Sequence, residues 1–246
     1  MKIRTFATWW LACLTLVFTG LATLHAGDAK TGFVHKIHKG PDGESKYVVF
    51  VPANYNADKA YPVILFLHGS GSTGDDGQKQ IKAGLAKAIR DKKEKFDFIT
   101  IFPQAKTKGW QANGENGKRA LAILDEVHKD YKTDKKRVYL TGLSMGGFGT
   151  WSLAAAHPDR WAAIAPICGG GDPATAAKFK DVPCWCFHGD ADKVVPADRS
   201  RAMIKALKAV GGAPKYDEYP GVDHNSWDRA YANAELYAWF LKHAVK

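Results

Sequence analysis

The sequence predicts an α/β fold whose central sheet is mostly parallel and carries helices on both faces. Residues 61–67 form a continuous apolar run, which is typical of a parallel strand covered on both faces. Strand-like and helix-like segments then alternate along the chain, as right-handed strand–helix–strand crossovers require. The third observation is a glycine-flanked turn at 142–146 that joins a strand pattern to a helix pattern.

The first 26 residues differ from the rest of the 246-residue chain. Two basic residues precede an apolar run, residues 6–24, that closes near Ala26, which is the pattern of a secretory signal peptide. We therefore expect a signal peptide at 1–26 and one α/β domain at 27–246. The mature protein would be secreted or periplasmic, without stable membrane association. Because the run approaches the length of a membrane span, an uncleaved N-terminal anchor is the alternative.

The apolar periods predict the elements in order along the chain. Strands are expected at 46–51, 61–67, 96–103, 138–143, 161–167, 184–187 and 215–219. Helices are expected at 80–90, 117–131, 147–157 and 197–210, with a last helix leading to residue 246. The connection between residues 167 and 184 is too short to hold several helices, so no large cap domain is expected over the sheet.

The glycine-flanked turn carries the first candidate for chemistry. Gly142 and Gly146 flank Ser144 at the G-x-S-x-G spacing, where a sharp strand-to-helix turn holds the serine in strained backbone geometry. The N-terminus of the following helix points its dipole and the backbone N–H of Met145 at any oxyanion formed there. Ser144 is therefore the candidate nucleophile, and Met145 N–H is a candidate donor of an oxyanion hole.

A Gly-rich loop, residues 68–74, follows the apolar strand at 61–67. Such a loop presents backbone N–H groups without side-chain obstruction, which the second half of an oxyanion hole requires. We expect Ser70 N–H to be this second donor. The segment lacks the Gly-Lys-Ser/Thr ending of a phosphate-binding P-loop, and this disfavours nucleotide binding.

Two carboxylates follow the strand at 184–187, where the carboxyl ends of parallel strands share one crevice. Asp190 lies directly at the strand end and is placed to brace the turn. Asp192 lies further out, and with His224 it completes the chain order Ser, Asp, His. We prefer Asp192 as the acid. His224, in the turn after the last strand, is the candidate general base.

Charge and cysteine content bear on whether the protein binds nucleic acid, forms disulfides or holds a metal. The net charge is +10, but the lysines are scattered in short groups, which indicates a solvated surface and no nucleic-acid binding. Beyond the signal peptide lie Cys168, Cys184 and Cys186, which we expect to be buried free thiols, with a bridge from Cys168 to one of the others as the alternative. His35 and His38 have no accompanying acidic or Cys cluster, so we expect a surface pair and no metal.

Together these motifs resemble the α/β-hydrolase superfamily and, within it, the secreted esterases. The resemblance runs through the mature chain at Leu67-His68-Gly69-Ser70-Gly71, Gly142-Leu143-Ser144-Met145-Gly146-Gly147, His188-Gly189-Asp190-Ala191-Asp192 and Gly221-Val222-Asp223-His224. More narrowly, the sequence is similar to feruloyl and acetylxylan esterases, to polyhydroxybutyrate depolymerase-like proteins, and to prolyl oligopeptidase-like or dienelactone hydrolase-like chains. Dienelactone hydrolases proper resemble it least, because their nucleophile is a cysteine and residue 144 is a serine.

The resemblance implies a serine carboxylesterase that forms an acyl-enzyme and hydrolyses short or aromatic acyl esters, including esters on plant polysaccharides. Ser144 would attack, His224 would carry the proton, and Asp192 would orient the imidazole. No metal or organic cofactor is implied. A prolyl oligopeptidase-like serine peptidase and a polyhydroxyalkanoate depolymerase are the alternatives.

Three further side chains are candidates for substrate contact. Gln104 and Trp110 follow the strand at 96–103, and Trp227 lies three residues after His224. All three are placed near the shared crevice and are expected to line an acyl or sugar subsite. Packing in the core or at the rim is the other interpretation for the two aromatic side chains.

Overall fold

The computed structural model describes residue 1, residues 30–92 and residues 95–245. The expected signal peptide therefore lies, apart from its first residue, outside the described residues. Within them the strands are β1 Gly32–Gly40, β2 Gly43–Val51, β3 Tyr61–Leu67, β4 Ile99–Pro103, β5 Thr133–Leu143, β6 Ala163–Ile167, β7 Trp185–Gly189 and β8 Lys215–Tyr219. They form one sheet in the order β1-β2-β4-β3-β5-β6-β7-β8. Only the β1–β2 and β2–β4 pairs are antiparallel, which confirms the mostly parallel sheet.

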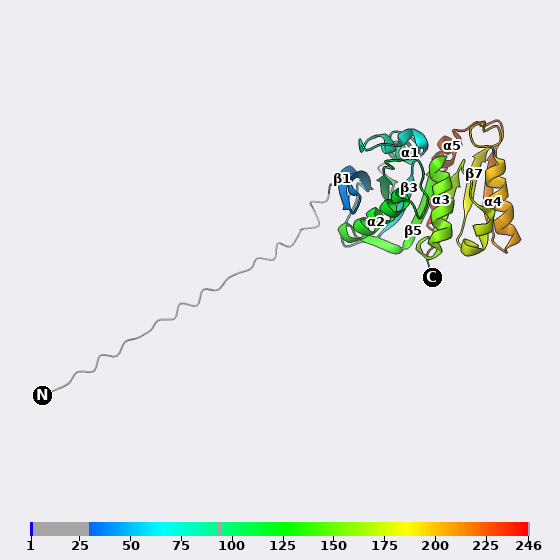
Figure 1. Ribbon diagram of the computed structural model, residues 1–246. Helices are drawn as coiled ribbons and strands as arrows, with labels where there is room; N and C mark the ends of the chain where they lie inside the picture. Colours follow the sequence, from blue (N-terminus) through cyan, green and yellow to red (C-terminus); the bar gives the residue numbers. More distant parts are fainter. Residues whose placement is uncertain (2–29, 93–94, 246) are drawn as a thin grey trace.

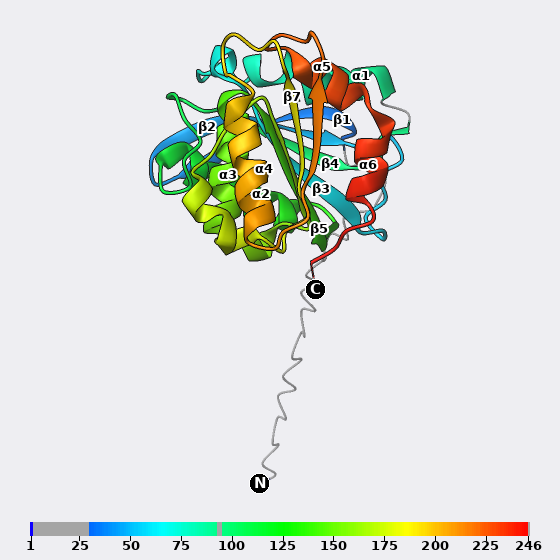
Figure 2. The same cartoon turned by 90° about the vertical axis from the view of Figure 1, so that its right-hand side faces the viewer.

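Helices cover both faces of this sheet, as predicted. The α-helices are α1 Leu85–Lys92, α2 Glu115–Asp130, α3 Met145–Ala156, α4 Asp198–Ala209, α5 Ser226–Ala232 and α6 Ala234–Phe240. Short 3-10 helices are η1 Ser70–Ser72, η2 Lys79–Ile81, η4 Pro158–Arg160 and η5 Pro173–Phe179. Helices α2, α3 and α4 lie on one face and α1, α5 and α6 on the other (Figures 1 and 2). None of the helices in the described ranges has the length and apolar character needed to cross a membrane.

Strand β3 shows how the sequence pattern builds two cores. Every residue of β3 is buried. Because side chains alternate along a strand, Val63 and Leu65 pack with α2, α3 and α4, while Ile64 and Phe66 pack with the helices of the opposite face. Strand β5 lies beside β3 in parallel, so the loops that leave the two strands emerge at the same edge of the sheet.

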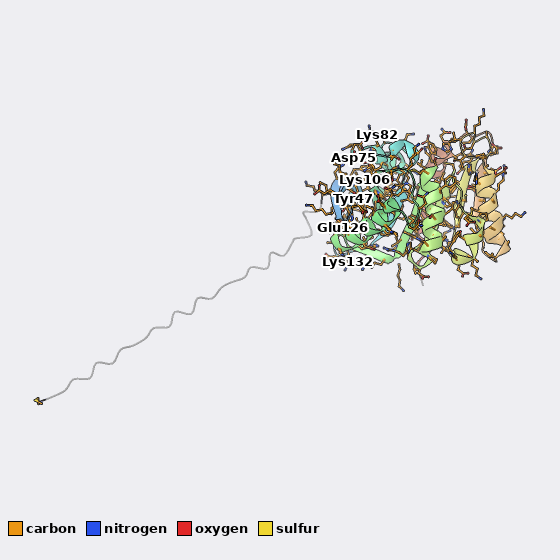
Figure 3. The ribbon with its side chains drawn as sticks, viewed as in Figure 1. Tyr47, Asp75, Lys82, Lys106, Glu126 and Lys132 are labelled. Carbon is orange, nitrogen blue, oxygen red and sulfur yellow. The ribbon has the colours of Figure 1, made fainter. Side chains whose placement is uncertain are left out.

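Strand β1 was not predicted from the sequence. Its burial alternates and its apolar residues are interrupted by His and Lys, as expected of an edge strand. His35 and His38 lie three residues apart on this strand, so they point to opposite faces and do not form a pair. His38 Nδ1 is instead hydrogen-bonded to Glu126 Oε2 of α2 (2.7 Å), and the Tyr47 hydroxyl of β2 donates to Glu126 Oε1 (3.0 Å; Figure 3).

Two predicted helices differ from the structure. The segment 80–90 is divided into η2 and α1, with Gly84 between them at φ +64°. The segment leading to residue 246 is divided into α5 and α6, because Asn233 ends the first and caps the second by accepting from Glu235 N–H (2.9 Å). The Asn233 side-chain cap thus divides what the apolar pattern of the sequence predicts to be one helix.

The predictions for the cysteines and for the short connection between residues 167 and 184 are confirmed. Cys168, Cys184 and Cys186 are buried free thiols. Cys168 packs on the α1, α5 and α6 side, whereas the other two face the opposite core, which explains why no bridge joins them. Between β6 and β7 the chain holds η5 and no cap domain, so the carboxyl edge of the sheet is left open at this connection.

Candidate active site

The turn between β5 and α3 has the strained geometry that its glycines predict. Ser144 adopts φ 53° and ψ −118°, a left-handed conformation that non-glycine residues rarely occupy. A Cβ added to Gly142 would collide with the Gly146 carbonyl, and one added to Gly146 would collide with the Leu67 carbonyl. The strained serine is held by its own N–H, which donates to Ile167 O (3.0 Å). Close backbone packing therefore presents the Ser144 side chain at the sheet edge.

Three side chains from separate loops form a hydrogen-bonded relay at this edge. His224 Nε2 lies 3.0 Å from Ser144 Oγ, and His224 Nδ1 lies 2.7 Å from Asp192 Oδ2. An ionised carboxylate only accepts, so Nδ1–H donates to Asp192 and Nε2 accepts from the serine hydroxyl. The Asp192 side chain is fully buried, while that of His224 is 19% exposed. The relay thus runs from a buried acid to a solvent-accessible serine.

Backbone hydrogen bonds keep the acid in place and ionised. Asp192 Oδ1 accepts from Val194 N–H (2.9 Å) and Val195 N–H (2.8 Å). Burial alone would raise the pKa of the Asp192 carboxyl, but the hydrogen bonds from His224 and from these two backbone groups outweigh it and lower the pKa. Asp190, by contrast, is exposed and accepts from Gly221 N–H (2.7 Å). Asp190 therefore braces the turn, and Asp192 meets the histidine.

His188 also belongs to this cluster, and its role was not predicted from the sequence. Its ring is fully buried, and Nε2 lies 2.8 Å from Val195 O and 3.2 Å from Asp192 Oδ2. Burial lowers the pKa of His188, so the ring is neutral: Nε2–H donates toward these oxygens, and Nδ1 accepts from the Ser200 hydroxyl (2.7 Å). The one sequence feature that could have indicated its role is a histidine at the end of an otherwise apolar strand. It positions Asp192 from the side opposite His224.

The two expected oxyanion donors belong to two segments next to Ser144, the start of α3 and the loop after β3. Met145 is the first residue of α3, so its N–H has no acceptor within the helix. The loop that leaves β3 passes next to the serine, because a Cβ added to Gly69 would lie 3.6 Å from Ser144 Cβ. Ser70 follows Gly69 at the start of η1. The backbone N–H groups of Met145 and Ser70 are thus brought to the same edge by α3 and by the Gly-rich loop.

Two of the three expected substrate contacts are interior residues. Gln104 is 2% exposed, and its amide accepts from Gly77 N–H (2.7 Å) and donates to Ser72 O (3.0 Å). Trp110 is 1% exposed, and its indole N–H donates to His68 O (3.0 Å). Both side chains hold the loops around the site and expose almost no surface to solvent.

Trp227 lies at the site itself. Its ring meets the His224 ring edge to face, with 5.3 Å between the ring centroids, and it is partly exposed. Because it packs on the imidazole and still reaches solvent, Trp227 remains a candidate for substrate contact. The packing on His224 also restricts the rotation of the base.

His68 joins the two loops on the β3 side of the site. Its Nδ1–H donates to Gly69 O (2.7 Å), and Nε2 accepts from Ala105 N–H (3.0 Å). The ring is 2% exposed, and burial lowers the pKa of His68 to about 4. The hydrogen bond from Ala105 N–H requires the neutral ring, since a protonated Nε2 could no longer accept.

Acid should therefore destabilise the fold through His68. The unfolded chain takes up a proton at His68 below about pH 6.5, whereas the folded chain resists it down to about pH 4. The free energy of unfolding should fall by roughly 3 kcal/mol over this interval through His68 alone. Urea unfolding of the wild type and of His68→Gln at several pH values checks this. The slope against pH should be shallower in the variant, and equal slopes would contradict the assignment.

The donor set at the site favours hydrogen bonding over metal binding. Among the described residues, Cys168, Asp192 and His224 are the group whose ligand atoms lie within 4.8 Å of one another. Burial raises the pKa of the Cys168 thiol far above its ordinary value, so the sulfur is a neutral thiol and not the thiolate that zinc prefers. Cys168 Sγ instead lies 3.3 Å from Ser144 N, where it supports the turn beneath the serine.

Known proteins are similar to this chain in sequence and in fold. The profile of the dienelactone hydrolase family matches residues 44–237. The Aspergillus flavus protein named "Probable feruloyl esterase C" is 26% identical over 220 residues, covering 86% of this chain and 80% of the relative. A bifunctional acetylxylan esterase/xylanase of Neocallimastix patriciarum is 28% identical over 195 residues, covering 78% of this chain and 27% of the relative.

A solved structure described as a thermostable esterase superimposes with a TM-score of 0.79 at 32% identity, covering 86% of this chain and 63% of that chain. The chain thus spans less than two thirds of that neighbour. Dienelactone hydrolases proper were expected to resemble this chain least, because their nucleophile is a cysteine and residue 144 is a serine. The family profile matches the chain despite this difference. Because the family profile covers well over half of the sequence, this chain, with its α/β-hydrolase fold, belongs to the dienelactone hydrolase family.

Proposed function

We propose that this ester hydrolase is an exported serine esterase that cleaves short or aromatic acyl esters, including esters still attached to a plant polysaccharide. The observation that carries the proposal is the continuous relay from Asp192 through His224 to Ser144, at 2.7 and 3.0 Å. The relatives named for feruloyl and acetylxylan ester hydrolysis support the choice of substrate class. The apolar segment at 6–24, outside the described residues, supports export.

The reaction follows from the groups in contact. Ser144 Oγ attacks the ester carbonyl carbon as its proton passes to His224 Nε2, and the negative charge on the carbonyl oxygen is stabilised by the N–H groups of Met145 and Ser70. The carbon–oxygen bond to the alcohol then breaks, and the imidazolium returns its proton to the leaving alkoxide. Water repeats the sequence on the acyl-enzyme, releasing the acid and regenerating the serine. Asp192 stabilises the imidazolium in both halves.

The open edge of the sheet supports bulky substrates over long lipid chains. The β6–β7 connection holds only η5, so no cap encloses the serine from this side. An enzyme with a movable lid excludes water and is activated at a lipid interface, whereas an open site admits a polymer. We infer that the enzyme acts without interfacial activation.

A substrate comparison tests the proposed function. The purified mature chain should hydrolyse p-nitrophenyl acetate and methyl ferulate with kcat/KM at least about 100-fold above its value for an emulsified long-chain triglyceride, since a site without a lid does not enclose a long acyl chain. A prolyl-anilide and a polyhydroxyalkanoate suspension are assayed in parallel. Faster cleavage of either alternative substrate, or a sharp rate increase at the emulsion threshold, would contradict the proposal.

A further inference from the structure

Helix α3 differs from the other helices on its outward face. It carries no charged residue from Met145 to Ala156, whereas every other α-helix in the described part of the chain carries at least one. The helix lies between α2 and α4 on the near side of the sheet in Figure 1, and its Phe148 is 38% exposed. Surface helices of globular proteins normally present charged residues to solvent. Seven of its twelve residues are buried, and the remaining strip, with its exposed aromatic ring, is the kind of surface on which an uncharged ligand can bind.

This face is the floor of an open groove. A hollow of about 700 Å³ is lined by Phe148, Ser152, Ala155 and Ala156 of α3. A second hollow of about 320 Å³ is lined by Met145, Phe148 and Ser152, so the two adjoin along the helix. Because Met145 directly follows the candidate nucleophile, the groove begins beside the ester site. From Phe148 to Ala156 it follows the helix for about 12 Å, which is long enough for a disaccharide.

The groove has a preformed wall. The loop 109–113 is tied to α3 at two points, because Gly109 N–H lies 3.1 Å from Met145 Sδ and Ala112 N–H donates to Ser152 Oγ (3.0 Å). A binding site whose walls are already fixed loses little conformational entropy when a ligand binds. We call the two hollows together the α3 groove, defined by Met145–Ala156, the loop 109–113 and residues 170–178.

The chemistry of the α3 groove fits a neutral sugar chain. The side-chain amides of Gln111 and Asn113 and the hydroxyl of Thr175 line it, together with His157 and with Asp172 and Lys178, whose opposite charges leave the lining without a net charge. Each amide offers donors and an acceptor together, which matches the neighbouring hydroxyls of a sugar, and the Phe148 ring is suited to the apolar C–H face of a sugar ring. A polyester chain offers only acceptors, so it would leave half of these groups unmatched. An acyl group favours an enclosed pocket, whereas this groove is open along its length.

We propose that the α3 groove binds the neutral oligosaccharide chain to which the scissile ester is attached, with Phe148 as the main contact. This inference rests on the proposed esterase function, and it adds the site that selects a polysaccharide-linked ester over a small one. Sugar units beyond the esterified one would extend from Met145 toward Ala156. Their binding would lower KM and leave the chemical step at Ser144 unchanged.

The test compares one acyl group on alcohols of increasing length. Acetyl or feruloyl, whichever the wild type cleaves faster as a small ester, is placed on xylose and on xylo-oligosaccharides up to the tetrasaccharide. In the wild type kcat/KM should rise about tenfold with chain length, through KM. Phe148→Ala should remove this rise and change kcat/KM for the small ester by less than about twofold. Ile37→Ala, which truncates another exposed apolar side chain (50% exposed) on β1, should behave like the wild type.

Three other results of this experiment would each contradict a different part of the proposal. No dependence on chain length in the wild type, or a rise that survives in Phe148→Ala, would overturn the proposal while leaving the esterase function intact. A rise seen with 3-hydroxybutyrate oligomers and not with xylo-oligosaccharides would show that the groove takes a polyester. Absence of hydrolysis of every ester, small ones included, would instead refute the proposed function on which the groove assignment rests.

Discussion

Replacing Ser144 with Ala should lower kcat by about 10⁴–10⁶-fold, because the members of a nucleophile–base–acid relay act as a unit. The substitution removes one oxygen and leaves the turn held by its backbone contacts, of which Ser144 N–H to Ile167 O is one. The free energy of unfolding should therefore stay close to that of the wild type. Turnover of p-nitrophenyl acetate and urea unfolding, measured on the same preparation, check both halves of this expectation.

A matched serine variant controls for a general loss of structure. Ser72 lies in the same Gly-rich region, and its hydroxyl donates to Lys79 O (3.1 Å) without touching the relay. Ser72→Ala should keep turnover within a few-fold of the wild type. If Ser144→Ala retained more than about one percent of wild-type kcat, the covalent mechanism would be untenable.

Asp192→Asn should lower kcat by about 10⁴-fold. An amide at this position would present its N–H₂ group or its oxygen to His224 Nδ1 and would no longer fix the tautomer in which Nε2 accepts from the serine. The matched control is Asp190→Asn, two residues earlier. Its exposed carboxylate accepts only from the turn at Gly221, so this variant should keep turnover and lose about 1 kcal/mol of stability.

The comparison of these two variants decides which carboxylate is the acid. Steady-state kinetics and urea unfolding of both proteins, side by side with the wild type, are sufficient. A large loss of turnover in Asp190→Asn with little loss in Asp192→Asn would show that the geometry has been assigned to the wrong residue.

Much of the parallel sheet could be predicted, because buried parallel strands read as continuous apolar runs. Strand β3, the clearest such run, has the predicted bounds, and α3 begins at Met145, two residues before its predicted start at 147. Strand β8 also has the predicted bounds, although its sequence Lys-Tyr-Asp-Glu-Tyr is mostly polar. Strand β1 could not be found in this way, since an edge strand with one face near solvent alternates His and Lys with apolar residues. The break at Asn233 depends on a local side-chain cap that the apolar period conceals.

The candidate site was predictable where chain order and turn chemistry specify it. Ser144, Asp192 and His224 occupy three separate loops, and the sheet order brings those loops together. Contacts that depend on side-chain direction could not be predicted. Gln104 and Trp110 follow the expected strand but turn inward to hold loops.

The role of His188 likewise rests on packing, since only the tight turn after β7 brings its ring back onto Asp192, at 3.2 Å. The exposed face of α3 could not be predicted from the sequence either. An uncharged helix sequence normally indicates burial on all sides, and the groove appears only once the neighbouring loops are in place.

The most direct test of the covalent mechanism is to trap the nucleophile. The mature wild type is incubated with a fluorophosphonate, digested, and mapped by peptide mass spectrometry, with Ser144→Ala and His224→Ala treated in the same way. We expect one phosphonyl adduct on Ser144 in the wild type, no adduct in Ser144→Ala, and labelling slowed by orders of magnitude in His224→Ala, because the base activates the serine. An adduct at another residue, or equal labelling in the presence and absence of His224, would contradict it.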